Sequence, residues 1–507
     1  MLPPSYLDRM PDAFVQLWQQ VEEQILQDVA RRIGKMDTVT PTANWQLWRY
    51  QQTEALRNDV VKLLAKYTGK SETAIRKLLL QAATEAMERE DAIYYHYDME
   101  PTPFEESAAL NNLLDAGARQ TCGTWQNLTA TTANTVTGAF ERTLDAAWLK
   151  VSTGAFDYKT AVKQAVDSLA DEMPMVTYPS GHKDSIEVAA RRAVLTGVNQ
   201  TCGKLQEARM DEMGCEFVET SAHGGARPSH AEWQGRQFHR GGAVTYKGKY
   251  YPDFYEATHY GSGDGIYGWN CSHTHFAIFP ELGAPPQWTQ EQLRELNARN
   301  IEWNGKKYTA YEISQMQRAR ERNVRRWKKR YLAEDAAGLD PTDAAVRLRA
   351  ARQSLAEFAQ ATGGRVDSAR TSVPKFGRSE AGKASYIVQK QTRFDAANKE
   401  LQQMREAGTI KAKGKLIASP PAPNEINFAS EHVLQRWAER GMGPMDAERI
   451  IRTSKIAMSQ RNGTQTCYYS EYGFVAIGQD GNVASIGPLD EGGKKLMEVV
   501  RKHGIPH

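Results

Sequence analysis

The chain has few cysteines and no long apolar run. Its 507 residues include only five cysteines. Because they are odd in number and widely spaced, we expect no disulfide framework and a reducing compartment. No apolar run reaches the length of about eighteen residues that would indicate a transmembrane helix, so no membrane association is expected. The first residues carry prolines and acids without an apolar centre, so we expect no signal peptide there.

Net charge and apolar content are also low. The formal charge of +3 is small for this length and gives no global signal for nucleic-acid binding, so any basic function must come from local clustering. The apolar fraction is 40 % and the mean hydropathy is −0.61. These values favour long, surface-rich helices over one thick core, and the length predicts two to four domains.

Apolar spacing predicts a mainly α protein with an irregular α+β central module and a separate C-terminal α+β domain. Apolar residues three and four positions apart predict a helix with one apolar stripe over residues 13–36. Gly69 followed by Ser71 predicts a break between two helices within residues 45–94. Near the C-terminus, Asp480-Gly481 between two strand-like runs predicts a hairpin. The expected domains are a helical body (1–213), a Gly-, His- and aromatic-rich module (214–286), a basic helical segment (287–374), a linker (375–425) and a small α+β domain (426–507).

The central module carries the residues most suited to binding a metal. Cys271, His273 and His275 alternate, so on a strand they would share one face, and His223 and His230 lie about forty residues upstream. Zinc takes thiolate sulfur and imidazole nitrogen, usually four in a tetrahedron. We therefore predict a structural zinc site drawn from this set, chiefly His223, His230, Cys271 and His273. The alternative is a polar cluster in which the histidines only make hydrogen bonds.

The same module carries a family resemblance. The motifs SAHGGARPSHAEWQGRQF, YPDF, YGSGDG and GWNCSH follow one another, with VAARRAVLTGVNQTCGKLQE upstream and YEISQMQRARERNVRRWKKR downstream. In this order they resemble the phage minor capsid protein 2 family and, more distantly, the head-morphogenesis proteins of Mu-type phages, over roughly residues 1–375. Related proteins have Cys-Arg-Cys or Cys-Arg-His where this chain has Cys271-Ser272-His273, so a role for the middle arginine is in doubt.

The resemblance implies a structural protein of the phage head, present in few copies and acting near the portal in head assembly and DNA packaging or ejection. The implied partners are the portal and major capsid proteins and the phage DNA. The implied location is the virion, with the host cytoplasm during assembly.

A basic helix near the end of the resemblance is a candidate DNA contact. The cations that we expect to reach phosphates are Arg318, Arg322, Arg325, Arg326 and Lys329. They occupy nearly every angle of the helix. The alternatives are contact with an acidic protein and a solvated helix face.

The C-terminal domain offers a second kind of chemistry. His432, Arg436 and Arg440 have four-residue spacing and would share one helix face. A helix pair followed by a small antiparallel sheet resembles the ribonuclease-like toxins of the barnase, colicin and RelE type. The resemblance implies His432 as acid or base and the arginines as phosphate clamps, with Tyr469 and Ser485 on the facing sheet. The alternative is a catalytically silent module in which the arginines pack by their stems.

Three functions are therefore predicted from the sequence. The leading one is a non-enzymatic structural protein of the phage head. The second is a head-delivered effector whose C-terminal domain is a metal-independent ribonuclease-like toxin. The third is a nucleic-acid-binding protein unrelated to phage.

Overall fold

The chain divides into two compact units, Met1–Gly377 and Arg378–His507. The computed structural model describes residues 2–36, 42–153, 157–172, 175–177, 183–283, 285–410, 414–418, 420, 423, 426–428, 435 and 439–505.

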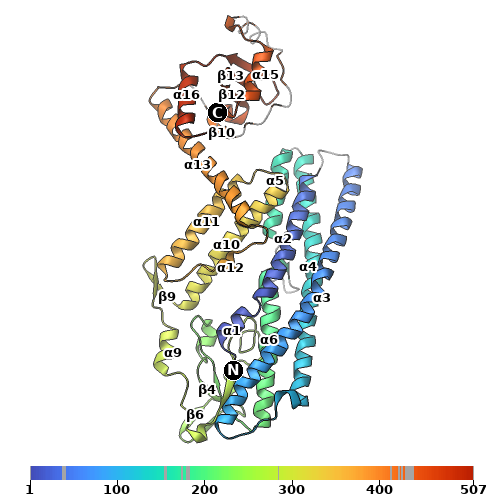
Figure 1. Ribbon diagram of the computed structural model, residues 1–507, viewed down its shortest axis with the longest axis vertical. Helices are drawn as coiled ribbons and strands as arrows, with labels where there is room; N and C mark the ends of the chain where they lie inside the picture. The colour runs from blue at the N-terminus through green and yellow to red at the C-terminus, as the bar shows by residue number, and fades with distance from the viewer. Residues whose placement is uncertain are drawn as a thin grey trace. The chain divides into compact units, whose positions relative to one another are not determined.

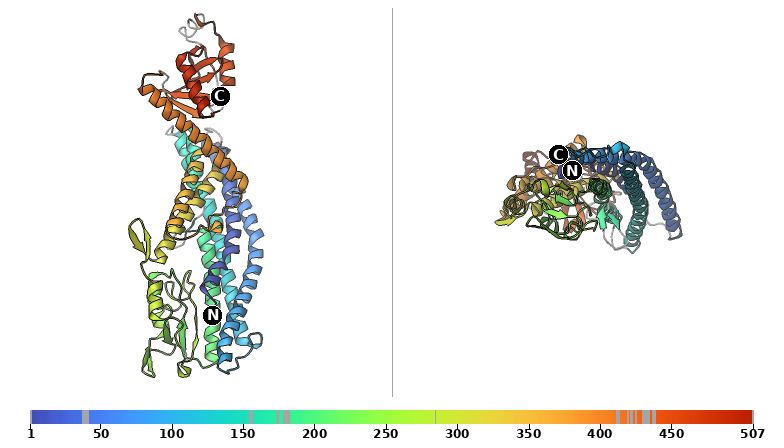
Figure 2. Two further views of the ribbon diagram at one scale, coloured as in Figure 1. Left: turned by 60° about the vertical axis from the view of Figure 1, so that its left-hand side comes forward. Right: turned by 90° about the horizontal axis from the view of Figure 1, so that it is seen from below.

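The first unit is built on long helices. They are α1 (Pro4–Arg9), α2 (Asp12–Gly34), α3 (Thr42–His96), α4 (Ala108–Ser152), α5 (Tyr158–Glu172), α6 (Ile186–Glu212), α10 (Ala310–Ala336), α11 (Thr342–Ala361) and α12 (Ser368–Thr371). The 55 residues of α3 span roughly 80 Å at the usual helical rise. Helices α3, α4 and α6 pack side by side, and α2 and α5 contact the same bundle (Figure 1, Figure 2).

The core of this bundle is apolar and partly aromatic. Trp125 of α4 is 1 % exposed and meets the rings of Phe14 and Trp18 of α2 edge to face, with ring centroids 5.5 Å and 5.7 Å apart. Such edge contacts add to the large apolar area that each ring buries. The apolar stripe predicted for residues 13–36 is therefore the face by which α2 joins the bundle.

The predicted break at Gly69 is wrong, because α3 runs through it without interruption. The Ser71 hydroxyl donates to the Tyr67 carbonyl at 2.7 Å within the helix instead of capping a new one. Leu64 and Ile75, on either side of the glycine, are both buried in the bundle core. Their burial favours one continuous helix and outweighs the roughly 1 kcal/mol that a mid-helix glycine costs.

Helices α4 and α6 approach closely through two matching pairs of small residues. A Cβ atom at Gly117 would lie 2.2 Å from the Thr201 hydroxyl oxygen, and one at Gly197 would lie 2.3 Å from that of Thr121. Both threonine hydroxyls donate to the carbonyl four residues earlier, which is Gly117 for Thr121 and Gly197 for Thr201, at 2.8 Å and 2.7 Å. On each helix, the absence of a side chain at the glycine thus makes room for the threonine of the other helix.

The central module folds on small antiparallel sheets. Strand β3 (Phe217–Thr220) lies between β4 (Gln237–His239) and β7 (His275–Ile278), and β5 (Val244–Tyr246) pairs with β6 (Lys249–Tyr251). Short helices α7 (Pro228–Ala231) and α8 (Phe254–Ala257) lie in the connections. Outside this sheet, β1 (Met175–Thr177) pairs with β2 (Lys183–Ser185), while α9 (Gln290–Leu296) and the hairpin of β8 (Ile301–Trp303) and β9 (Lys306–Tyr308) lead to α10.

The second unit is a five-stranded antiparallel meander with helices on both faces. Its strands are β10 (Lys415–Ala418), β11 (Ile456–Gln460), β12 (Gln465–Ser470), β13 (Gly473–Gly478) and β14 (Val483–Gly487), paired in chain order. Helices α13 (Arg378–Glu406) and α16 (Glu491–Lys502) pack on one face, with Leu401 and Leu496 in the core, and α15 (Pro444–Thr453) packs on the other through Ile450. The predicted hairpin at Asp480-Gly481 is confirmed.

The linker predicted over residues 375–425 is largely a helix of the second unit. The second unit begins at Arg378, and α13 occupies 29 of those residues. Phe394, Ala397 and Leu401 of this helix are buried against the sheet. Because these three apolar positions are scattered among many lysines and glutamines, the composition resembles that of a linker although one helix face is part of the core.

Candidate functional site

Two segments of the central module bring a thiol and two imidazoles together. His230 lies on α7, which begins with Pro228 at its first turn, a position where the missing amide hydrogen is not needed. Cys271 and His273 lie in the extended segment just before β7. Strand β3 holds the two segments near each other, because the chain after β3 leads to α7 and β7 pairs with β3.

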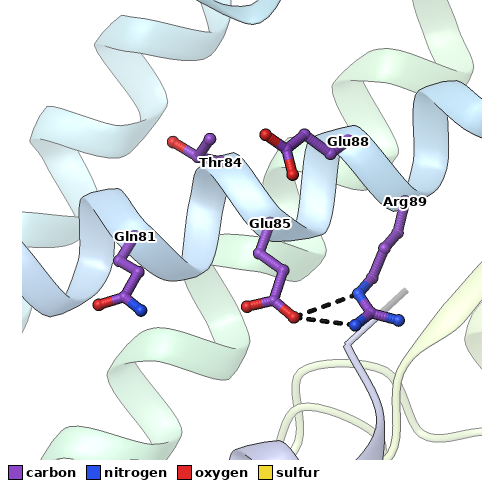
Figure 3. Close-up of a pocket in the computed structure, with 5 residues that line it drawn as sticks. All are labelled: Gln81, Thr84, Glu85, Glu88 and Arg89. Atoms are coloured by element: carbon purple, nitrogen blue, oxygen red, sulfur yellow. Dashed lines mark hydrogen bonds and ion pairs between the residues drawn. The ribbon is translucent and has the colours of Figure 1, made fainter.

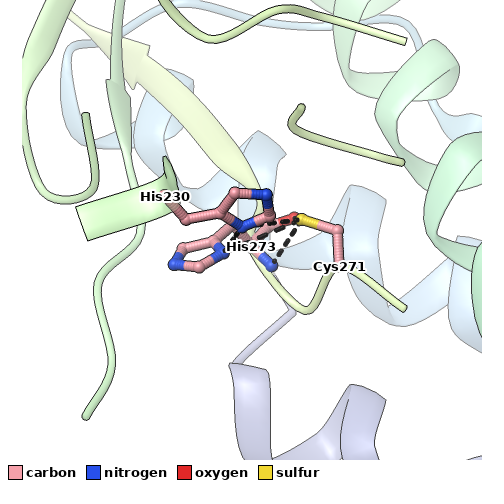
Figure 4. Close-up of side chains that lie close together, drawn as sticks. All are labelled: His230, Cys271 and His273. Carbon is pink, nitrogen blue, oxygen red and sulfur yellow. Dashed lines mark hydrogen bonds between the residues drawn. The ribbon is translucent and has the colours of Figure 1, made fainter. Parts of the chain in front are cut away.

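The donor atoms of these three residues converge (Figure 4). His230 Nδ1 lies 3.2 Å from His273 Nδ1, and Cys271 Sγ lies 3.9 Å and 3.7 Å from these two nitrogens. All three residues are 2 % exposed or less. Thiolate and imidazole are the ligands that zinc prefers, so the arrangement is chemically suited to that metal.

The outer nitrogens of both imidazoles have fixed partners. His230 Nε2 donates to the Asp264 carbonyl at 2.7 Å, because a carbonyl can only accept. His273 Nε2 donates at 3.1 Å to Gln234 Oε1, which also accepts from the amide of His223. Both hydrogens therefore sit on Nε2, and both Nδ1 lone pairs point into the cluster. Metal-binding histidines are commonly oriented in this way by an acceptor on the other ring nitrogen.

Burial keeps the three groups neutral when no cation is bound. It lowers the pKa of His230 to about 4 and the pKa of His273 well below its usual value. It raises the pKa of the Cys271 thiol to about 11. Neutral imidazoles are the form that coordinates a metal, whereas the thiol has to release its proton on binding.

The other two predicted ligands are not among the convergent donors. The ring of His223 lies against that of His273 at a centroid distance of 4.4 Å and a tilt of 32°, without a nitrogen in the convergent set. His275 turns to a different network, in which its Nδ1 is 2.6 Å from the Tyr267 hydroxyl and its Nε2 is 2.8 Å from Glu207. Gln234 and Asp264, which orient the cluster, were not predicted, since a backbone carbonyl and an amide leave no spacing signal in a sequence.

The His275 network ties β7 to helix α6. Burial alone would raise the pKa of Glu207, but His275, the Tyr255 hydroxyl and the Arg240 guanidinium hold it at about 2. Arg240 lies 2.8 Å from the same carboxylate. The carboxylate is therefore charged at neutral pH and fixes the module against the helical bundle.

A glycine-rich turn places the Asp264 carbonyl that receives His230. A Cβ atom at Gly265 would lie 1.9 Å from the His259 carbonyl oxygen, and one at Gly268 would lie 2.3 Å from the carbonyl oxygen of Ser262. The backbone therefore folds back on itself at a distance that only glycine permits. The glycines of this turn serve close packing beside the cluster.

The basic helix α10 is bound into the first unit by ion pairs. Lys329 is 7 % exposed and contacts Glu22 and Glu187, Arg325 contacts Glu187 at 2.8 Å, and Arg326 contacts Asp171 at 2.6 Å. These three cations already have carboxylate partners. The DNA contact stays a prediction, for which Arg318, Arg322 and Arg326 are exposed whereas Lys329 is buried.

The predicted ribonuclease residues lie partly outside the described part of the chain, which excludes His432 and Arg436. Arg440 donates to the Ile486 carbonyl at 2.5 Å, at edge strand β14. Tyr469 is buried in the core on the face covered by α13 and α16. Ser485 is on β14, paired with Ala476 of that same face, and the ribonuclease site stays a prediction.

A hollow on the surface of the first unit is also without convergent chemistry. It has a volume of about 560 Å³ and is lined by five side chains of one helix, α3 (Figure 3). Two of them, Glu85 and Arg89, form an ion pair at 2.9 Å along the helix. All five lining residues belong to one helix, so the hollow is a shallow stretch of helix surface.

Comparison with known families places most of the first unit in a class of phage capsid proteins. Residues 2–360 match the model of such a family. The family is phage minor capsid protein 2, and the chain belongs to it.

A curated relative supports the same class. The chain is 27 % identical over 248 residues to a "Structural protein" of Lactococcus phage LL-H. The aligned region covers 47 % of this chain and 63 % of the relative. The match thus spans less than two thirds of the length of that relative. No solved structure matches the chain significantly. Within the described helices, none combines the length and the apolar character needed to cross a bilayer.

Proposed function

We propose that this protein is a low-copy structural component of the phage virion that acts near the portal during head assembly and DNA packaging or ejection. The family match over residues 2–360 carries this proposal. The matched range includes nearly all of the first unit, whose end is at Gly377. The portal and major capsid proteins are the proposed partners. Assembly would take place in the host cytoplasm.

The internal contacts of the first unit support a structural role. Its buried charges are paired across distant segments. Lys329 pairs with Glu22, and Arg209 lies 2.8 Å from Asp91. Its central module is joined to the bundle through Asn199, whose amide donates to the carbonyls of Cys271 and His273 at 2.9 Å and 3.1 Å. Bundle and module are thus connected by buried polar contacts, which favour a fixed geometry.

Co-assembly with the portal tests the proposed location. The full chain is co-expressed with the portal protein of the same phage and, separately, with its major capsid protein, and each complex is purified by size. We expect the chain to elute with portal rings. Elution with neither partner, or with the major capsid protein alone, would contradict action near the portal.

A further inference from the structure

We propose that His230, Cys271 and His273 bind one zinc ion through His230 Nδ1, Cys271 Sγ and His273 Nδ1. The ion would join α7 to the segment before β7, two parts of the chain that are 41 residues apart along the sequence. This site is independent of the role in the phage head.

The distances match the edges of a zinc tetrahedron. With Zn–N of about 2.05 Å and Zn–S of about 2.3 Å, two nitrogen ligands lie about 3.3 Å apart and a nitrogen and a sulfur about 3.6 Å apart. The observed separations are 3.2 Å between the nitrogens and 3.7 Å and 3.9 Å from them to the sulfur. One point can therefore lie at bonding distance from all three donors.

The hydrogen-bond pattern calls for a cation at that point. Both Nδ1 lone pairs face each other because both Nε2 hydrogens are donated outward, to Asp264 and Gln234. The single hydrogen of a Cys271 thiol can satisfy only one of them. A zinc ion satisfies all three donors at once, and the thiol proton passes to solvent as the thiolate–zinc bond forms.

A backbone amide is also placed to stabilise a thiolate. The amide of His273 donates to Cys271 Sγ at 3.4 Å. Hydrogen bonding to the charged form of a group favours that form. With two neutral imidazoles and one thiolate, the zinc centre would carry a net charge of about +1.

The fourth ligand is expected from His223, whose ring nitrogens lie outside the convergent set and would have to turn toward it on metal binding. Its ring lies against that of His273, and its Nδ1 lies 3.2 Å from the Gly224 carbonyl, which fixes the hydrogen on Nδ1. Its Nε2 is buried and has no hydrogen-bond partner within the described structure. An unpartnered lone pair beside the cluster makes this nitrogen the natural donor to complete the tetrahedron.

Metal analysis of the full chain tests the site. The protein is prepared without a histidine tag, dialysed against metal-free buffer and analysed by plasma mass spectrometry. We expect about one zinc per wild-type chain, and at least a tenfold lower content in Cys271→Ser. His96→Gln is the matched control, because His96 is exposed at the end of α3, and it should keep the wild-type content. Wild-type protein without stoichiometric zinc, or Cys271→Ser with full zinc, would overturn the proposal.

Cobalt substitution keeps the proposal testable if Cys271→Ser does not fold. The wild-type chain loaded with Co²⁺ should show a thiolate-to-cobalt charge-transfer band together with the intense visible bands of tetrahedral cobalt, and the absence of the charge-transfer band would rule out Cys271 as a ligand. His223→Ala should bind zinc at least tenfold more weakly than wild type. Unchanged affinity would contradict the assignment of His223 as the fourth ligand.

Discussion

Replacing Lys329 by methionine is expected to lower the free energy of unfolding of the first unit by about 3–5 kcal/mol. The ammonium group lies 2.5 Å from Glu22 and 3.5 Å from Glu187, and all three residues are buried. Glu22 is 2 % exposed, and its second oxygen already has no hydrogen-bond partner in the described part of the protein. Without Lys329 its carboxylate would be left in the core without a cation, whereas Glu187 keeps Arg325.

The measurement is denaturant unfolding followed by tryptophan fluorescence. Ten of the eleven tryptophans lie before residue 378, so the signal reports the first unit. The control is Arg347→Ala, which removes an exposed pair with Asp343 and should change stability by no more than about 1 kcal/mol. The double variant Glu22→Leu/Lys329→Met should recover most of the loss, because replacement of both charges removes the unpaired carboxylate. A loss below about 1 kcal/mol for Lys329→Met would show that this buried pair does not stabilise the bundle.

Replacing Gly197 by leucine is expected to lower the same free energy by about 3 kcal/mol or more, at the upper end for an overpacked core. A Cβ atom there would lie 2.3 Å from the Thr121 hydroxyl oxygen and 3.0 Å from its Cβ atom. Rotation of the threonine cannot relieve the second contact, so α4 and α6 would have to move apart. The shift would also disturb the reciprocal contact between Gly117 and Thr201.

Gly123 provides a control of opposite sign on α4. A Cβ atom at this position meets no atom within 4 Å. Gly123→Ala should therefore raise stability by about 0.5–1 kcal/mol through helix propensity alone. If Gly197→Leu left stability unchanged in the fluorescence-detected unfolding, the close approach of α4 and α6 would not depend on glycine.

Local patterns predicted much of the helical architecture and the family. The apolar stripe of α2 and the hairpin at Asp480-Gly481 are encoded in neighbouring residues, and the structure confirms both. The break at Gly69 and the linker over residues 375–425 were wrong for one reason. In each case apolar side chains are buried against distant segments, and this burial stabilises a helix that the local composition disfavours. Residue spacing alone does not reveal such contacts.

The candidate zinc site and the basic helix were likewise predicted only in part. His230, Cys271 and His273 could be selected from residue type and spacing, since thiol and imidazole groups are unusual enough to stand out. The orientation of the two imidazoles by Gln234 and Asp264 could not be predicted from the sequence, because it depends on the tertiary fold. Lys329 looked like part of a solvated or DNA-binding charge run, and only the folded chain brings Glu22 to it, from more than three hundred residues away.

The central claim is that this chain is a minor structural protein of the phage head, and counting it in virions tests this most directly. Virions are purified through a density gradient and washed at high salt, and labelled reference peptides are used to quantify this protein, the portal protein and the major capsid protein. We predict that the chain is retained in particles at a copy number far below that of the major capsid protein and comparable to that of the portal. Absence from washed virions, or a copy number equal to that of the major capsid protein, would contradict the account.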